Sequence, residues 1–159
     1  MNDGTDRLKR RLRADLKPEE CKPVGLSTGS TLLNLACTGR TGTGLVAGHY
    51  YLFVGDSQAA KTWLALTVLA EAHISQAFRN HRLIYDNAER GALMDVRRFF
   101  GKGLSHRLEP PSKKGHSVLI DDFYDNMAAV ARGGCPFIYV LDSEDALKPG
   151  GEPKAGYDT

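Results

Sequence analysis

Short apolar runs alternate with longer segments of helical character along this chain. The runs at residues 50–54, 82–85 and 137–141 are rich in aromatic and β-branched side chains and are bounded by turn-forming residues. Runs of this kind are typical of strands that a sheet buries on both faces. Because such strands alternate with helices, the pattern predicts an α/β fold, a parallel sheet flanked by helices with right-handed crossovers.

Three helices are predicted between and around these strands. Residues 63–70 are apolar nearly all round, which indicates a buried helix after the first strand. A second helix covers residues 90–100 and ends at Gly101, and a third begins with Asp121 or Asp122 as its cap and ends near residue 132.

The connections carry their own signals. Residues 30–37 are predicted to form a short helix with a hydroxyl cap at its start. Residues 38–48 are rich in glycine, and residues 101–116 are rich in Gly, Pro and Lys, so both segments are predicted to be loops.

These elements divide the chain into a charged N-terminal arm at residues 1–20, a core at residues 21–149 and a disordered tail at residues 150–159. In the arm, leucines spaced four apart interleave with Lys and Arg. A solvated helix lying on the core is one interpretation of this pattern, and a contact to another subunit or to phosphates is the other.

Composition narrows the class of protein. The 159 residues suffice for one domain of the usual ~100–200 residues. With 42% hydrophobic and 25% charged residues, wholesale disorder is excluded. No apolar run approaches the roughly 18 residues of a spanning helix, so no membrane is expected as a partner. Because the net charge is only +2, any nucleic-acid site is expected to be a local basic patch. The three cysteines form no CxxC pair, which indicates reduced thiols in a cytoplasmic protein.

The turn after the first predicted strand nearly matches the phosphate-binding loop pattern G-x-x-x-x-G-K-[ST]. Its residues are Gly55, Asp56, Ser57, Gln58, Ala59, Ala60, Lys61 and Thr62. Backbone N–H groups at the start of the following helix attract an anion. Lys61 is expected to reach the β- and γ-phosphates, and the Thr62 hydroxyl is expected to coordinate Mg²⁺. The pattern therefore predicts a site for nucleotide phosphates.

Ala60 stands where the pattern has its second glycine. If the position requires a left-handed conformation, the Cβ costs about 1–2 kcal/mol. If it requires only a close approach of backbone to phosphate, the methyl group crowds the ligand instead. Either effect weakens binding by a factor of about ten without abolishing it.

Two further carboxylates lie at the ends of predicted strands, where ligands of α/β sheets bind. Asp142 closes the last strand and is placed to hold Mg²⁺ through a water. Glu89 follows the second strand, where a carboxylate can orient an attacking water. Alternatively, Glu89 is an ordinary acidic residue in the first turn of a helix, where the helix dipole favours it. Asp86, Glu144 and Asp145 are alternatives for the catalytic carboxylate.

Several segments together resemble the RecA recombinase family, especially its bacteriophage-type members. Residues 27–36 (STGSTLLNLA) are similar to the family's STGS…LD.AL helix, and residues 55–62 (GDSQAAKT) are similar to its Walker A loop. Residues 83–89 (LIYDNAE) are similar to its FIDAE strand end, and residues 130–149 are similar to its Walker B stretch. The resemblance extends from about Gly25 to Pro149.

The resemblance implies a RecA-like P-loop NTPase core that uses ATP and Mg²⁺. It further implies DNA-dependent ATP hydrolysis and strand exchange in DNA recombination and repair, with single-stranded DNA as a partner and assembly into a homo-oligomer or filament. By analogy, Glu89 is the water-activating carboxylate and Asp142 is the Walker B acid. Asn87 is inserted relative to the FIDAE pattern.

In that family a further strand lies between the Walker A and Walker B strands, and the DNA-binding loops follow it. Neither follows Pro149 here, so we expect a sheet that is incomplete at the C-terminus, as in a truncated or split recombinase. Two other functions fit the sequence: a non-catalytic interaction module that pairs with full-length subunits, and another RecA-fold ATPase such as a helicase.

Overall fold

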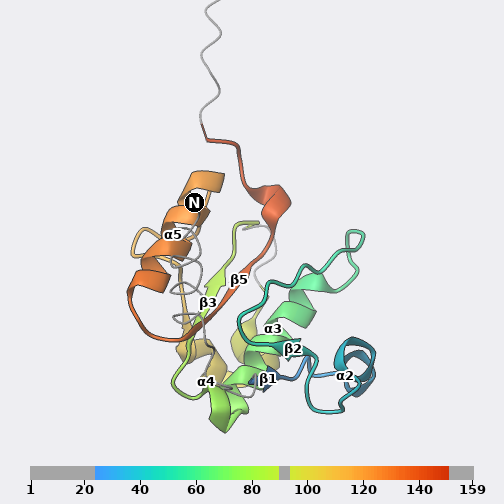
Figure 1. Cartoon of the computed structure of the whole chain (residues 1–159). Coiled ribbons are helices and arrows are strands. Elements are labelled where there is room, and N and C mark those ends of the chain that lie inside the picture. Colours follow the sequence, from blue (N-terminus) through green and yellow to red (C-terminus); the bar gives the residue numbers. More distant parts are fainter. Residues whose placement is uncertain (1–23, 90–93, 151–159) are drawn as a thin grey trace, which may run out of the picture.

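The central sheet has three parallel strands, β3 (Arg82–Asp86), β4 (Leu108–Glu109) and β5 (Phe137–Leu141), with β3 in the middle (Figure 1). They belong to a computed structural model that describes residues 24–89 and 94–150; most of the predicted arm and tail lies outside these residues. Between β3 and β5, Arg82 lies opposite Phe137 and Asp86 lies opposite Leu141. The predictions of strands at 82–85 and 137–141, and of a parallel sheet flanked by helices, are confirmed.

Helices lie on both faces of this sheet (Figure 1). On one face, α3 (Lys61–Ile74) packs on α4 (Val96–Arg107), and fully buried leucines of α3, α4 and β3 form the core. On the other face lies α5 (Ile120–Arg132), where the ring of Phe123 meets that of Tyr139 at 5.7 Å between centroids. The predicted helix at 63–70 is confirmed as part of α3. The expectation that it is buried nearly all round is wrong, since the Trp63 side of the helix is 43% exposed at that residue.

The segment before the phosphate-loop motif adds a small antiparallel pair, β1 (Gly25–Leu26) with β2 (Leu45–Val46), and the helix α2 (Thr31–Thr38). The Ser30 side chain accepts a hydrogen bond from the N–H of Leu33, which confirms the predicted hydroxyl cap. The prediction of a loop throughout residues 38–48 is wrong at β2, because Leu45 packs into the core beside Leu26.

The prediction of a buried strand at residues 50–54 is wrong. The segment pairs with no described strand, and Tyr50, Leu52 and Val54 are 75–90% exposed. Phe53 alone packs against the core. The physical reason is the absence of a neighbour: an apolar run becomes a strand only where another strand takes up its backbone N–H and C=O groups.

The predicted stop at Gly101 is a kink. Gly101 has φ 86° and ψ 166°, and helical backbone continues to Arg107 beyond it. The prediction of a loop at 101–116 is therefore wrong for its first half, since Leu104 is fully buried and β4 follows. Only the part of the predicted 90–100 helix from Val96 onward is described as helix.

The third predicted helix begins as α5 with Leu119, not an aspartate, in the cap position. Asp122 still closes the first turn, because its carboxylate accepts from the N–H groups of Val118 and Leu119. These bonds lower the pKa of Asp122. The remaining elements are two single-turn helices, η1 (Gln76–Phe78) and η2 (Glu144–Ala146). Within the described ranges, no helix is long and apolar enough to span a membrane.

Candidate functional site

The loop 55–60 enters α3 through backbone conformations that favour glycine. Ala60 immediately precedes the helix with φ 59° and ψ 26°, and Gln58 has φ 70°. Among the described residues no side chain caps the start of α3, and its first turn holds no acid. The leading N–H groups of this 14-residue helix therefore remain available to an anion.

Lys61 lies folded over its own loop. Its Nζ donates to the carbonyl oxygens of Gly55 at 2.7 Å and of Asp56 at 2.9 Å. The Lys61 charge also reaches η2: the pKa of Asp145 is lowered chiefly by a hydrogen bond from Ser143 and to a smaller degree by Lys61. Because these carbonyls belong to an exposed loop, the ammonium can exchange them for phosphate oxygens without leaving a buried group unpaired.

Thr62 and Asp142, 80 residues apart in the sequence, meet at the carboxyl edge of the sheet. The Thr62 hydroxyl donates to Asp142 Oδ1 at 3.1 Å, and Asp142 is 8% exposed. The other carboxylate oxygen, Oδ2, accepts from the Tyr85 hydroxyl at 2.8 Å. Burial, and secondly this bond to Asp142, raise the pKa of Tyr85, so its hydroxyl stays protonated and donating.

These donors suit Mg²⁺. A hydroxyl and a carboxylate are hard oxygen ligands, and Mg²⁺ keeps several waters and binds few protein groups. In the described part of the chain, no group of three or more His, Cys, Asp or Glu residues could hold a metal by itself. The residues present therefore fit a magnesium ion shared with phosphates, held by Thr62 and through a water by Asp142, better than an ion caged by protein alone.

Glu89 lies at the same edge of the sheet. Its N–H donates to the main-chain carbonyl of Asp142 at 3.0 Å, and its side chain is exposed. Its charge also contributes, after burial and Asp142, to the raised pKa of Tyr85. The structure thus brings the Glu89 main chain beside Asp142, and the role of its carboxylate stays a prediction.

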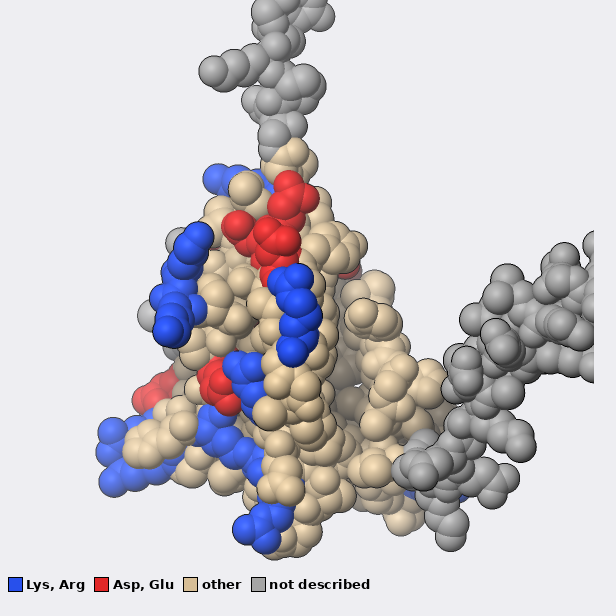
Figure 2. All heavy atoms as spheres, turned by 60° about the vertical axis from the view of Figure 1, so that its left-hand side comes forward, with Lys and Arg blue, Asp and Glu red and all other residues tan. Residues whose placement is uncertain are grey.

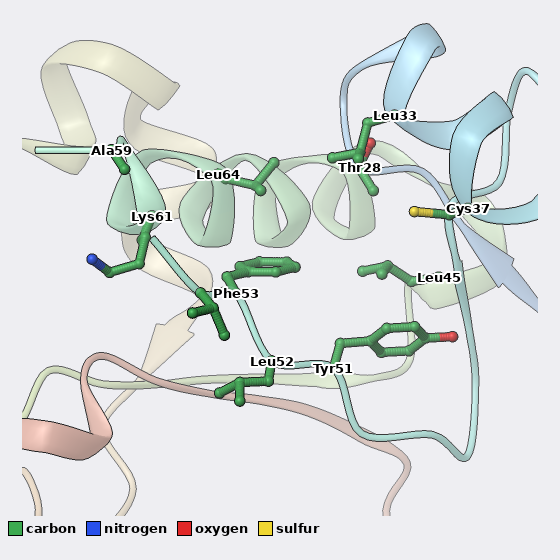
Figure 3. Close-up of a pocket in the computed structure, with 11 residues that line it drawn as sticks. Thr28, Leu33, Cys37, Leu45, Tyr51, Leu52, Phe53, Ala59, Lys61 and Leu64 are labelled. Atoms are coloured by element: carbon green, nitrogen blue, oxygen red, sulfur yellow. The ribbon is translucent and has the colours of Figure 1, made fainter. Parts of the chain in front are cut away.

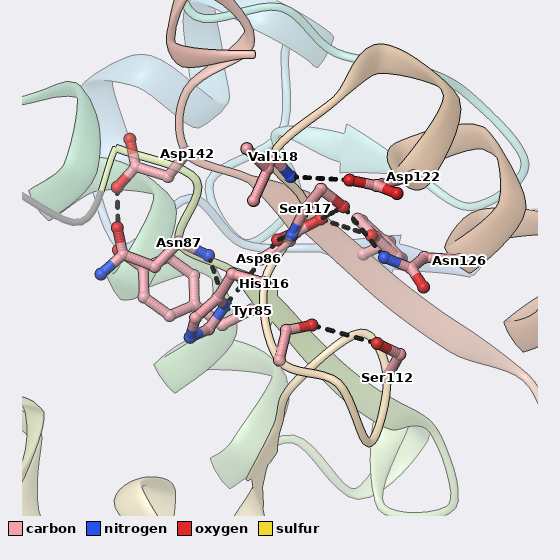
Figure 4. A network of polar contacts seen from close by, with 12 residues as sticks. Tyr85, Asp86, Asn87, Ser112, His116, Ser117, Val118, Asp122, Asn126 and Asp142 are labelled. Carbon is pink, nitrogen blue, oxygen red and sulfur yellow. Dashed lines mark hydrogen bonds and ion pairs between the residues drawn. The ribbon is translucent and has the colours of Figure 1, made fainter. Parts of the chain in front are cut away.

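Asp86 lies on the opposite face of the sheet, under α5. It is fully buried, and its carboxylate accepts from the Ser117 N–H at 2.8 Å, the Ser117 hydroxyl at 2.6 Å and the Tyr139 hydroxyl at 2.7 Å (Figure 4). The Asn126 amide donates to the same serine hydroxyl at 3.0 Å. The two Ser117 bonds hold the loop before α5 to the sheet, and both carboxylate oxygens of Asp86 accept hydrogen bonds on this face, away from the phosphate loop.

Sequence reasoning missed the two tyrosines that hold these aspartates. Tyr85 of β3 donates to Asp142 after β5, and Tyr139 of β5 donates to Asp86 at the end of β3. Each strand therefore supplies a hydroxyl to the carboxylate of the other. The available signal is the alternation of side chains along a strand, which separates the two aspartates onto opposite faces once the β3–β5 register is fixed.

A cavity of about 360 Å³ lies between α3 and residues 51–54 (Figure 3). Its walls are mainly apolar and include Phe53 and Leu64, with the Cys37 thiol at the α2 side. Lys61 lines one end but directs its ammonium away from the cavity (Figure 3). Ala59 and Lys61 of the loop 55–62 line this end, so the cavity adjoins the phosphate-loop motif. Sequence reasoning did not anticipate it, because it forms behind the segment predicted as a strand.

Comparison of the chain with protein-family models, curated proteins and solved structures gives no match.

Proposed function

We propose that this chain binds Mg-ATP at the loop 55–62 and is the nucleotide-binding segment of a RecA-like ATPase of DNA recombination and repair. The observation that carries the proposal is the 3.1 Å bond between Thr62 and Asp142. It joins a loop with the phosphate-binding pattern to a strand-end carboxylate, and phosphoryl transfer needs this pairing to position a metal-bound triphosphate.

Each residue has a distinct task in this proposal. The N–H groups at the start of α3 bind phosphate oxygens, helped by the helix dipole. Lys61 releases the carbonyls of Gly55 and Asp56 and pairs with the β- and γ-phosphates. Thr62 and Asp142 hold Mg²⁺, which neutralises charge on the phosphates when it is bound. Tyr85 orients the Asp142 carboxylate by donating to Oδ2.

Glu89 completes the proposed site as the carboxylate that orients the attacking water. Two observations support this assignment: the Glu89 main-chain N–H bonds to Asp142, and the Glu89 side chain is exposed. Two of the competing carboxylates are less suitable, since Asp86 is bonded on the other face and Asp145 is paired with Ser143. Glu144 of η2 is exposed and stays an alternative. We expect Glu89→Gln to retain ATP binding and to abolish turnover.

Single-stranded DNA and further copies of the chain are the partners in this proposal. Figure 2 shows one face, on which Lys and Arg side chains stand in separate groups with acidic side chains between them. On this face, the described residues form no continuous basic stripe that could follow a phosphate backbone. Since this face alone offers no such stripe, we expect DNA binding to be promoted by ATP-dependent assembly of several chains.

The experiment measures phosphate release from Mg-ATP with and without single-stranded DNA, for the natural chain, Glu89→Gln and the control Asp86→Asn. The proposal expects DNA-stimulated turnover that only Glu89→Gln abolishes while ATP binding persists, with Asp86→Asn affecting stability. The proposal would be contradicted if phosphate release did not respond to DNA and had the same rate in all three proteins.

A non-catalytic interaction module is the second candidate. It is favoured by the exposed apolar segment 50–54, since such a surface marks a contact with another polypeptide. This function expects association with a partner and no turnover of ATP.

A further inference from the structure

The turn that follows β3, residues 87–89, is held through three consecutive main-chain N–H groups. Those of Ala88 and Glu89 donate to main-chain carbonyl oxygens, at 3.1 Å and 3.0 Å. That of Asn87 donates to a side chain, the Nδ1 atom of His116, at 3.0 Å (Figure 4). A carbonyl oxygen accepts at any ordinary pH, whereas a histidine nitrogen accepts only while it carries no proton. Among these three acceptors, His116 is therefore the one that protonation can remove.

The backbone fixes His116 on both sides. Before it, the Gly115 N–H donates to the Ser112 carbonyl at 3.1 Å, and the Ser112 hydroxyl donates to the Gly115 carbonyl at 3.1 Å. Gly115 closes this tight turn with φ 100°, which favours glycine. After it, the Ser117 N–H and hydroxyl both donate to the buried Asp86. The loop thus holds the His116 ring beside the turn 87–89.

A second partner lies close to the same ring nitrogen. His116 Nδ1 is 3.7 Å from Oδ1 of Asp86. Among the described residues, Oδ1 accepts from the Ser117 N–H alone, whereas Oδ2 accepts from the hydroxyls of Ser117 and Tyr139. Because a carboxylate oxygen has two lone pairs, Oδ1 can accept one more donor. The His116 side chain is 36% exposed, so a proton from solvent can reach the ring.

These two partners of Nδ1 require opposite protonation states. Asn87 offers an N–H and needs a bare nitrogen, whereas Asp86 offers an oxygen and needs a protonated one. A movement of about 1 Å brings a protonated Nδ1 to the distance of a charge-assisted hydrogen bond with Asp86. The ring can therefore form the bond to Asp86 only by giving up the bond to Asn87.

The other titratable groups around the ring do not compete for Nδ1. On α5, the Asp122 carboxylate accepts from main-chain N–H groups at the start of its own helix. On β5, the Tyr139 hydroxyl donates to Asp86; burial, and secondly this bond, raise the pKa of Tyr139, so it stays protonated. On the loop itself, Lys113 and Lys114 are cations and offer no acceptor. Among the described residues, Asp86 is therefore the carboxylate within ion-pair distance of the ring.

We propose that His116 is a pH-sensitive positioning residue: in its neutral form it holds the turn 87–89, and on protonation it turns to Asp86 and releases Asn87. The consequence for turnover rests on the proposed function, since this turn carries Glu89. The loop 55–62 takes no part in these contacts. Protonation of His116 therefore lowers kcat and leaves the affinity for Mg-ATP unchanged.

The first experiment follows the chain without nucleotide by NMR between about pH 5 and pH 8. The ring signals of His116 give the pH at which it protonates. Amide hydrogen exchange gives the protection of Asn87 relative to an unstructured chain at the same pH. We expect the protection of Asn87 to fall about tenfold with the midpoint of the ring, while that of Ser117, which donates to Asp86, stays constant.

Three variants separate positioning from general stability, with phosphate release from saturating Mg-ATP as the second readout. His116→Asn supplies an oxygen acceptor that does not titrate, so the protection of Asn87 and the kcat should both persist at low pH. His116→Ala supplies no acceptor, so it should show low protection of Asn87 and a kcat about tenfold lower at every pH, with unchanged affinity for Mg-ATP. His106→Asn, at an exposed position of α4, is the matched control and should behave like the natural chain.

The proposal is overturned if the protection of Asn87 does not follow the protonation of His116, or if His116→Asn loses that protection at low pH as the natural chain does. It is also overturned if both proteins turn over Mg-ATP with the same pH profile. If the natural chain shows no turnover, the proposed function fails instead, and the exchange measurement decides the role of His116 by itself.

Discussion

Replacing Ala60 by glycine should stabilise this protein. Ala60 has φ 59° at the entrance to α3, where a Cβ costs about 1–2 kcal/mol. Glycine removes that cost but gives the unfolded chain more freedom, which offsets about 0.4–1 kcal/mol. The net gain lies between about 0 and 1.6 kcal/mol with a midpoint of about 0.8 kcal/mol, which corresponds to about 2–3 °C in melting temperature for a chain of this size.

The neighbouring residue provides the matched control. Ala59 is not among the positive-φ residues, so Ala59→Gly adds only freedom to the unfolded chain and should lower stability by about 0.4–1 kcal/mol. Thermal and urea unfolding of both variants measure the opposite signs. The reasoning would be refuted if Ala60→Gly lowered the melting temperature as much as Ala59→Gly does.

The same pair of variants separates strain from crowding of the ligand. The loop holds its left-handed conformation at Ala60 without a ligand, so strain that persists on binding cancels from the affinity, which corrects the expectation that strain weakens binding. We therefore expect Ala60→Gly to change the affinity for Mg-ATP little if strain is the whole effect. A gain of about tenfold would mean that the Ala60 methyl group crowds the phosphate.

Three further predictions follow from the polar contacts. Tyr85→Phe removes the hydroxyl that donates to Asp142 and should cost about 1 kcal/mol in urea unfolding; an unchanged midpoint would show that the bond contributes nothing. Ser117→Ala leaves the buried Asp86 with fewer donors and should cost about 1–3 kcal/mol, measured by thermal unfolding, and no loss would contradict the described network. Burial, and secondly Arg107, lower the pKa of His81, so stability falls as the pH drops below about 6.5, where the unfolded chain binds a proton that folded His81 does not. His81→Asn should flatten the dependence of stability on pH between about 7.5 and 5.5, and an unchanged slope would exclude His81 as its source.

The strands at 82–85 and 137–141 were predictable because apolar runs bounded by turn residues met real neighbours. The run at 50–54 carries the same pattern and is exposed. Apolar periodicity reports which residues can be buried, and it does not report whether the adjoining strand is present. The difference between these runs is therefore one of partners, which local sequence does not contain.

The kink at Gly101 had a similar cause. Glycine ends a helix when nothing beyond it is buried, but here Leu104 packs into the core. Arg107 then donates to the carbonyls that end α3 and surround η1, including those of His73 and Phe78. Tertiary contacts therefore extended the helix past a residue whose local preference is to stop it.

At the candidate site, the sequence predicts that Thr62 and Asp142 lie close together, and the structure joins them by a hydrogen bond; their role in binding stays a prediction. The choice between Glu89 and Asp86 could not be predicted, since it depends on the face of β3 to which Asp86 points and on the path of the chain after β3. The structure separates them: Asp86 points under α5 to Ser117, whereas Glu89 lies beside Asp142.

The central claim is tested most directly by titrating the chain with Mg-ATP in a calorimeter, with Lys61→Ala as the test variant and Lys102→Ala as the matched control on the exposed side of α4. We predict saturable one-to-one binding to the natural chain and to Lys102→Ala, and its loss in Lys61→Ala. Equal binding by Lys61→Ala, or no binding by any of the three proteins, would contradict a phosphate site at the start of α3.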